Sequence, residues 1–364
     1  MSERATEFCE MPRFLFLFLI SWILASSSAL HAADGRGIDG KQCLELEDHY
    51  KTSPFALQGT LVVTYVDQTI DPAKGDNHEV GVFDLAHPGV KVRRLTNDLV
   101  NQAEVDISPD GKKFLYTVRP KLDDFKSPAE IWQMNLDGSD PVRLVSGRSM
   151  GVPAWSPDGK QFMFIQWGGV SKDSQLFLYD FATKAVSPFA PDLKNPADPE
   201  YSYDGRWITF KMPVAGDRDF QPSIYVMNTD GSGVRRLTSG YSDHDPVFSR
   251  DNRKIYFERY FGPGDWFKSA KQHPEPEYHM WGIVEVDVET RQERVLIPPD
   301  PCGRHIFWLP TVSPDGQHLM YIHNDLQGKK DGKPWTELWV ADINGQNAQK
   351  VRGSDWFYFF DWTN

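Results

Sequence analysis

A four-residue phrase, Ser-Pro-Asp-Gly, recurs along this chain and constrains its fold more than any other feature. Complete copies begin at Ser108, Ser156 and Ser313, and altered copies read Ser-Tyr-Asp-Gly from Ser202 and Ser-Arg-Asp-Asn from Ser249. Pro presets φ, Asp hydrogen-bonds to nearby backbone and Gly accepts a positive φ, so the phrase favours a tight turn. Each copy follows a short apolar run and precedes an alternating one, which is typical of a hairpin. Five such turns predict a repeat architecture.

The repeat unit contains four predicted strands. After Ser108, three of them span residues 114–118, 131–135 and 142–145, and a fourth, Val105-Asp106-Ile107, precedes the serine. The repeat serines are 48, 46, 47 and 64 residues apart. Four strands in roughly 45 residues are typical of a β-propeller blade. The long last interval predicts an insertion within one blade, between Tyr260 and Trp281.

The two ends of the repeat region predict how the ring closes. The first unit, residues 60–96, lacks a clear innermost strand, and residues 357–363 match the segment that precedes each repeat serine. The C-terminal strand would then complete the N-terminal blade, which leaves only short outer edges unpaired. We therefore expect an all-β propeller of six four-stranded blades over residues 59–364. If residues 50–54 form the innermost strand of the first unit, the count becomes seven.

The first 33 residues are predicted to be a signal peptide. Arg13 supplies the positive charge, residues 14–24 form an apolar run too short to span a bilayer, and Ala32 or Ala33 ends a small-residue cleavage region. An uncleaved anchor is the alternative. Residues 34–58 are a polar lead to the propeller. Export permits disulfides, and Cys43 and Cys302 are the candidate pair that remains after cleavage.

Composition and missing motifs exclude several classes of function. The formal net charge is -12 without a basic patch, which argues against nucleic acid as a partner. There is no Cys-x-x-Cys-His motif, so we expect no covalently bound haem c in this chain. There is also no His-Glu-x-x-His or paired Cys-x-x-Cys zinc motif, no Gly-rich phosphate loop and no readable nucleophile–base pair.

One predicted face of the propeller carries the long loops, and the opposite face carries the Asp-Gly turns. The largest long-loop insertion, residues 259–280, is rich in aromatic side chains and histidine. Trp and Tyr are enriched in binding hot spots, so this insertion is a candidate partner-docking loop. The alternative is that it folds over its own blade. The candidate docking residues are Trp266, Phe267, His273, Tyr278 and His279.

Acidic residues recur four positions before the repeat serines, where each innermost strand should approach the central channel at the long-loop face. They are Glu104, Asp198 and Asp245, and Asp243 and His244 lie beside the last of them. Carboxylate oxygens could hold a hard cation such as Ca²⁺ at the channel mouth. Two alternatives stay open: acid–base chemistry involving His244, and a solvated acidic mouth without a ligand.

The repeats resemble those of TolB-like propellers. The resemblance rests on the Ser-Pro-Asp-Gly turn, on the aromatic before it (Trp155, Tyr201, Phe248), and on Asn-x-Asp-Gly turns at 135–138 and 228–231. It covers nearly all of residues 60–364 and implies fold rather than function. TolB carries a sizeable N-terminal α/β domain where this chain has about 25 residues. The Gly-x-Ser-x-Gly motif of prolyl-oligopeptidase relatives is missing, and oligogalacturonate lyases use a metal-binding His cluster.

An exported propeller without a haem motif is also similar to the beta subunit of hydrazine synthase from anammox bacteria. That resemblance implies a non-catalytic scaffold or docking subunit, located in the anammoxosome. Haem-bearing partner subunits would form hydrazine from nitric oxide and ammonium. Two alternatives remain: a stand-alone, metal-assisted polysaccharide lyase and a TolB-like envelope interaction protein. The absence of a readable catalytic set favours a binding role.

Overall fold

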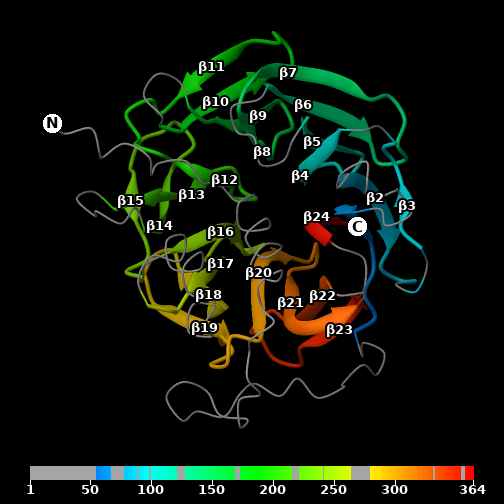
Figure 1. Ribbon diagram of the computed structural model, residues 1–364. Helices are drawn as coiled ribbons and strands as arrows, with labels where there is room; N and C mark the ends of the chain where they lie inside the picture. Colours follow the sequence, from blue (N-terminus) through cyan, green and yellow to red (C-terminus); the bar gives the residue numbers. More distant parts are fainter. Residues whose placement is uncertain are drawn as a thin grey trace, which may run out of the picture.

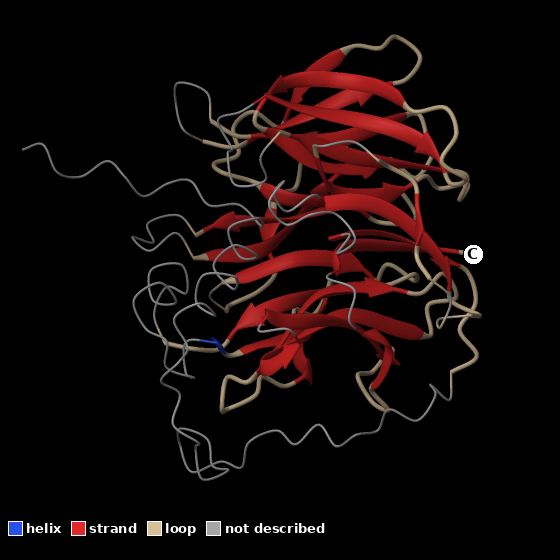
Figure 2. Cartoon of the chain, turned by 45° about the vertical axis from the view of Figure 1, so that its right-hand side comes forward, coloured by secondary structure: helices blue, strands red, loops and turns tan. Residues whose placement is uncertain are grey.

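The chain forms a ring of six β-sheets around a central channel (Figure 1). The computed structural model describes residues 55–66, 78–87, 89, 91–97, 100–120, 128–168, 173–214, 221–240, 242–263, 279–330, 333–353 and 357–364. The predicted signal peptide, residues 1–33, and residues 34–54 of the predicted lead lie outside these ranges. Strands make up almost all of the regular structure that Figure 2 shows. Within the described residues, no helix is long and apolar enough to cross a membrane.

Each sheet is a blade of four antiparallel strands, arranged from the channel to the rim. The first three blades are β24 (Phe357–Thr363), β1 (Thr60–Val66), β2 (His78–Asp84) and β3 (Arg93–Arg94); β4 (Asn101–Ile107), β5 (Lys113–Arg119), β6 (Pro128–Asn135) and β7 (Val142–Arg148); and β8 (Met150–Trp155), β9 (Gln161–Gln166), β10 (Gln175–Asp180) and β11 (Val186–Phe189). The last three are β12 (Ala197–Tyr201), β13 (Trp207–Pro213), β14 (Pro222–Asn228) and β15 (Arg235–Arg236); β16 (Asp243–Phe248), β17 (Lys254–Tyr260), β18 (Trp281–Asp287) and β19 (Glu293–Ile297); and β20 (His305–Val312), β21 (His318–Lys330), β22 (Lys333–Asp342) and β23 (Gln349–Gly353).

The ring closes as predicted, through the C-terminal strand. β24 pairs antiparallel with β1, with Leu61 opposite Trp362 and Val63 opposite Phe360. The innermost strands of neighbouring blades contact one another around the whole ring, including β20 with β24. The prediction of six blades is confirmed, and the seven-blade alternative is wrong.

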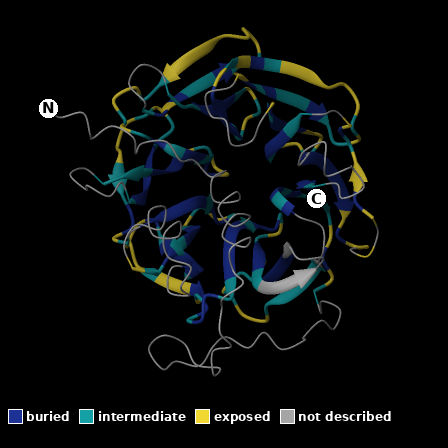
Figure 3. Cartoon of the chain, viewed as in Figure 1, coloured by how far each residue is buried: buried dark blue, intermediate teal, exposed yellow. Residues whose placement is uncertain are grey.

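The hydrophobic core lies between the blades. In β5, Phe114 and Tyr116 pack toward the first blade, whereas Leu115 between them packs toward the third. Successive side chains of a strand point to opposite faces of the sheet, so a strand buried on both faces needs an unbroken apolar run. Burial decreases from the inner strands to the rim, where the outer strands are half-buried or exposed over most of their length (Figure 3).

The Ser-Pro-Asp-Gly phrases form the turns between the first and second strands of their blades. In the second blade, the Gly111 N–H donates to Ser108 O at 2.8 Å, and the Ser108 hydroxyl donates to Asp110 Oδ1 at 2.7 Å. Gly111 has a φ of 68°, which is costly for residues with a Cβ. The altered copy from Ser249 places Asn252 there with a φ of 61°, and Asn tolerates this conformation better than most residues. These turns lie on one face of the ring, here called the Asp-Gly face.

Candidate functional site at the channel mouth

A cavity of about 450 Å³ occupies the central channel and reaches the Asp-Gly face. All six innermost strands contribute to its wall, so no single blade builds it. Its volume lies within the range of about 300–1,000 Å³ that is common for ligand pockets. The cavity is therefore the candidate functional site of the described structure.

A repeated β-bulge shapes the wall of this cavity. Val152, Asp198, Asp245 and Leu309 occupy equivalent positions in four innermost strands and have φ values between 49° and 53°. Each is followed by a proline, and the register of each strand shifts at that point. Proline cannot donate to the ladder and bulges bend a strand, so the repeated proline explains the local break in pairing.

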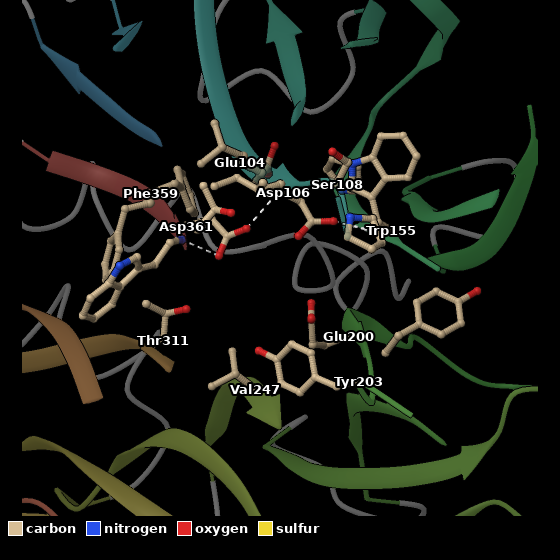
Figure 4. A pocket seen from close by; sticks show the side chains of 18 of the residues that line it. Glu104, Asp106, Ser108, Trp155, Glu200, Tyr203, Val247, Thr311, Phe359 and Asp361 are labelled. Atoms are coloured by element: carbon tan, nitrogen blue, oxygen red, sulfur yellow. Dashed lines mark hydrogen bonds between the residues drawn. The ribbon is translucent and has the colours of Figure 1, made fainter. Parts of the chain in front are cut away.

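Three carboxylates from three blades point into the same space at the mouth: Asp106 in β4, Glu200 in β12 and Asp361 in β24 (Figure 4). Two of them also tie neighbouring blades together. Asp106 Oδ2 accepts from the backbone N–H of Trp155 at 2.5 Å, and Asp361 Oδ2 accepts from the N–H of Ile107 at 2.8 Å.

Burial and mutual repulsion make the ionised form of the mouth carboxylates unfavourable. Burial, together with the charges of Glu200 and Asp361, raises the pKa of Asp106 well above its usual value. Burial likewise raises the pKa of Asp361. Both shifts show that the folded protein holds these carboxylates in an environment that disfavours their ionised form. A positive group that enters the cavity would relieve this repulsion.

The two altered turns place an aromatic and a cation at the same mouth. Tyr203 and Arg250 stand where the complete copies have proline, and both line the cavity. The Arg250 guanidinium lies 4.1 Å from the centre of the Tyr203 ring, a cation–π arrangement. Arg250 also donates to the carbonyls of Val312 and Ser313 at 3.1 and 3.0 Å. The Tyr203 N–H donates to Asn252 Oδ1 at 2.7 Å, so the changes in the two turns are structurally linked.

This arrangement suits binding. Five carboxylates line the cavity, and Arg250 is the one lysine or arginine among its lining residues. An acidic concave wall with an aromatic at its edge attracts positively charged groups and holds them through ion pairs and ring contacts.

The residues of the predicted cation site lie nearer the long-loop end of their strands than the carboxylates of the Asp-Gly mouth do. They take part in separate ion pairs. Arg119 Nη2 lies 3.4 Å from Glu104 Oε1, and both side chains are buried. Lys211 Nζ lies 2.6 Å from Asp198 Oδ2 and 2.8 Å from His244 Nδ1. The structure thus brings Asp198 and His244 together around a lysine.

Asp243 belongs to another buried network. It accepts from Arg259 at 2.6 and 3.0 Å and from the Thr238 hydroxyl at 2.5 Å, and Arg259 also bonds to Glu293. Asp245 is buried beside it in β16. Among the described residues, no group of three or more His, Cys, Asp or Glu side chains is placed to hold a metal ion. A Ca²⁺ site formed by these residues stays a prediction, and these contacts give it no support.

Most of the predicted docking loop lies outside the described residues, including Trp266, Phe267, His273 and Tyr278. His279 is described and is buried two residues before β18. Cys302 is disulfide-bonded. Cys43 lies outside the described residues, so the pairing of Cys302 with Cys43 stays a prediction.

The sequence pattern does not predict the carboxylates of the mouth as a site. Asp106 and Glu200 stand two residues before a repeat serine, where Val247 and Thr311 stand in other blades. Because the same position is apolar or neutral elsewhere, no acidic periodicity marks it. Only the closed ring brings Asp106, Glu200 and Asp361 together.

Comparisons with known proteins agree with this architecture. Residues 119–262 match the family described as the TolB beta propeller domain. An uncharacterised protein of Agrobacterium fabrum is 31% identical over 220 residues, which cover 59% of this chain and 68% of that protein. A Tol-Pal system protein TolB of Anaeromyxobacter dehalogenans is 34% identical over 111 residues, which cover 30% of this chain but only 24% of that protein.

A solved structure extends the likeness to the whole fold. The crystal structure of TolB from Acinetobacter baumannii aligns with a TM-score of 0.64 at 19% identity, covering 85% of this chain and 67% of that chain. At this identity the alignment shows the shared fold, and the match to the Agrobacterium fabrum protein adds a sequence relationship over most of that protein. The chain therefore belongs to the TolB-like β-propeller family.

Proposed function

We propose that this chain is an exported, non-catalytic interaction subunit that docks a positively charged segment of a partner protein at the channel mouth. The observation that carries the proposal is the acidic cavity, with the carboxylates of Asp106, Glu200 and Asp361 at its mouth and the Tyr203 ring beside them (Figure 4). Two adjacent turns depart from Ser-Pro-Asp-Gly at the same position, and both departures line the cavity.

Charge and composition support a protein partner. Tyr and Arg are enriched in binding hot spots, and complementary charge speeds encounter and suppresses wrong partners. A cavity of about 450 Å³ admits side chains of an inserted loop but is too small for a folded element. The chain belongs to the TolB-like family, and one relative is named as a Tol-Pal system protein. Both facts support a role in an envelope assembly.

The test removes the aromatic ring and one negative charge from the mouth. The double variant Tyr203→Ala and Glu200→Gln keeps the Tyr203 N–H that donates to Asn252 and the bonds from Arg250 to Val312 and Ser313, so the fold should persist. We expect partner capture during native purification from the source organism to fall about tenfold or more, the usual effect of removing a hot spot. Lys160→Ala, which removes an exposed lysine of another Asp-Gly turn, is the matched control and should keep full capture. Equal capture by the double variant and the control would contradict the proposal.

The finer assignment to hydrazine synthase has no support from the relatives named above, none of which carries that name. The same purification addresses it, because haem-bearing partner subunits would add a Soret absorbance band to the complex. The alternative of a metal-assisted polysaccharide lyase is favoured by no observation at the mouth.

A further inference from the structure

A line of four polar side chains crosses the whole sixth blade, one from each strand. Lys350 of β23 bonds to Glu337 of β22 at 2.5 Å, and Glu337 Oε2 lies 3.0 Å from His323 Nδ1 in β21. His323 Nε2 in turn lies 3.0 Å from His305 Nδ1 in β20. The two middle residues, Glu337 and His323, are buried, whereas Lys350 and His305 at the two ends are half-buried. None of the four lines the central cavity.

The hydrogen-bonding capacity of these groups sets the direction of the line. An ionised carboxylate only accepts, so Glu337 requires a proton on His323 Nδ1. In the tautomer with its one proton on Nδ1, His323 has a bare Nε2, which can only accept, and His305 Nδ1 must then donate to it. The remaining ring nitrogen, His305 Nε2, is left with its lone pair.

The surroundings of the line keep Glu337 ionised and His305 neutral at neutral pH. Burial alone would raise the pKa of Glu337, but the hydrogen bonds from His323 and Lys350 outweigh it and hold the pKa at about 2. Burial and then the neighbouring His323 lower the pKa of His305 to about 4. Asp325 and Asp300 oppose this shift and Arg304 reinforces it. His305 is therefore neutral at neutral pH.

His305 is half-buried at the start of its strand, so a ligand on that face of the ring can approach its Nε2. It is the first residue of β20, and β20 ends at the Ser313 turn, so His305 lies at the long-loop end of the blade. Its ring contacts His323 on one side, at 5.1 Å between ring centres. We propose that Lys350, Glu337 and His323 position His305 as a preorganised hydrogen-bond acceptor on the long-loop face, where Nε2 accepts a hydrogen bond from a hydroxyl or amide donor on a bound ligand. The same lone pair disfavours a carboxylate ligand at that point.

Two measurements on the full chain test this site independently of channel-mouth docking. The first is the tautomer: ¹⁵N resonances of the histidine rings at pH 7 should show His305 and His323 protonated at Nδ1. The second is the reaction with diethyl pyrocarbonate, which acylates only an unprotonated and accessible imidazole nitrogen. Between pH 7.5 and 5.5, we expect the rate at His305, followed by peptide mass analysis, to change less than twofold. The rate for free N-acetylhistidine should fall about tenfold, as an ordinary pKa of about 6.5 requires.

A matched pair of variants separates positioning from simple packing. Glu337→Gln removes the charge that orients the line, and the Nδ1 tautomer of His323 should be lost. Glu285→Gln is the control, because Glu285 holds Lys254 and Arg294 in the fifth blade without touching either histidine. A wild-type His305 that is protonated at Nε2, that does not react, or that follows the pH profile of free histidine would overturn the proposal. These wild-type readings decide the question even where a variant fails to fold.

Discussion

Asp106 lies beside Glu200 and Asp361 at the channel mouth, where its ionisation works against the folded state. Its raised pKa means that the charged form is disfavoured on folding, a penalty present above the folded pKa and absent below the unfolded value of about 3.9. We therefore predict that Asp106→Asn stabilises the protein at pH 7.5 by about 1 kcal/mol, since Asn can still accept the Trp155 N–H. The gain should vanish near pH 3.5 in thermal unfolding. Asp110→Asn is the opposite-sign control, because hydrogen bonds lower the pKa of Asp110; stabilisation by both variants would contradict the argument.

Asp243 shows how a residue that resembles a metal ligand can be structural. Its carboxylate is fully buried and held by two bonds from Arg259. Removing one partner leaves an uncompensated buried charge, which costs about 3–5 kcal/mol. We predict that Arg259→Met lowers stability by that amount in chemical unfolding, equally with and without added Ca²⁺. Arg143→Met breaks an exposed pair with Glu130 and should cost no more than about 1 kcal/mol. A loss that Ca²⁺ restores would instead favour a cation site.

Strand β24 is the element on which closure of the ring depends. It buries four aromatic side chains, and truncating a buried Phe or Trp to Ala costs about 3–5 kcal/mol each. The four are Phe357, Phe359, Phe360 and Trp362. Their combined loss exceeds the whole stability of a typical domain, about 5–15 kcal/mol. We predict that deleting residues 357–364 abolishes cooperative unfolding measured by circular dichroism. Deleting only the exposed Asn364 should leave the transition unchanged, and a cooperative transition in the longer deletion would contradict the closure argument.

The strands and blades could be predicted from the sequence because the turn phrase between them repeats. The turn phrase recurs in five of the six blades, so its period predicted the blades, and the unmatched C-terminal strand predicted closure. The ion partners of Glu104 and Asp243 do not recur: Arg119 and Arg259 stand at strand ends without a common phrase. The role of Tyr203 and Arg250 depends on the contact between neighbouring turns, which a linear sequence does not contain. A proline three residues before four of the repeat serines would have predicted the bulges.

For the whole molecule, two kinds of titrating group predict a two-stage loss of stability in acid. Burial lowers the pKa of His78 to about 3. Burial, together with the neighbouring His323, lowers the pKa of His305 to about 4. The unfolded chain takes up these protons below about pH 6.5 while the folded protein does not, so stability falls as the pH drops from there. The carboxylates of the Asp-Gly turns have lowered pKa values and lose their contribution only below about pH 4. They include Asp110, Asp137, Asp158, Asp230 and Asp315.

We therefore predict that Tm declines gradually from about pH 6.5 to 4.5, offset in part by protonation of Asp106 and Asp361 with their raised pKa values, and steeply below pH 4. His78→Gln should flatten the first stage, even if it lowers Tm throughout, because it removes a group that only the unfolded chain protonates in this range. His87→Gln, at an exposed histidine paired with Asp84, should leave the slope unchanged. Differential scanning calorimetry at half-unit pH steps distinguishes the two. An equal slope in wild type and His78→Gln would mean that buried histidine does not set the acid limit, and a single transition below pH 4 would assign it to the turn carboxylates alone.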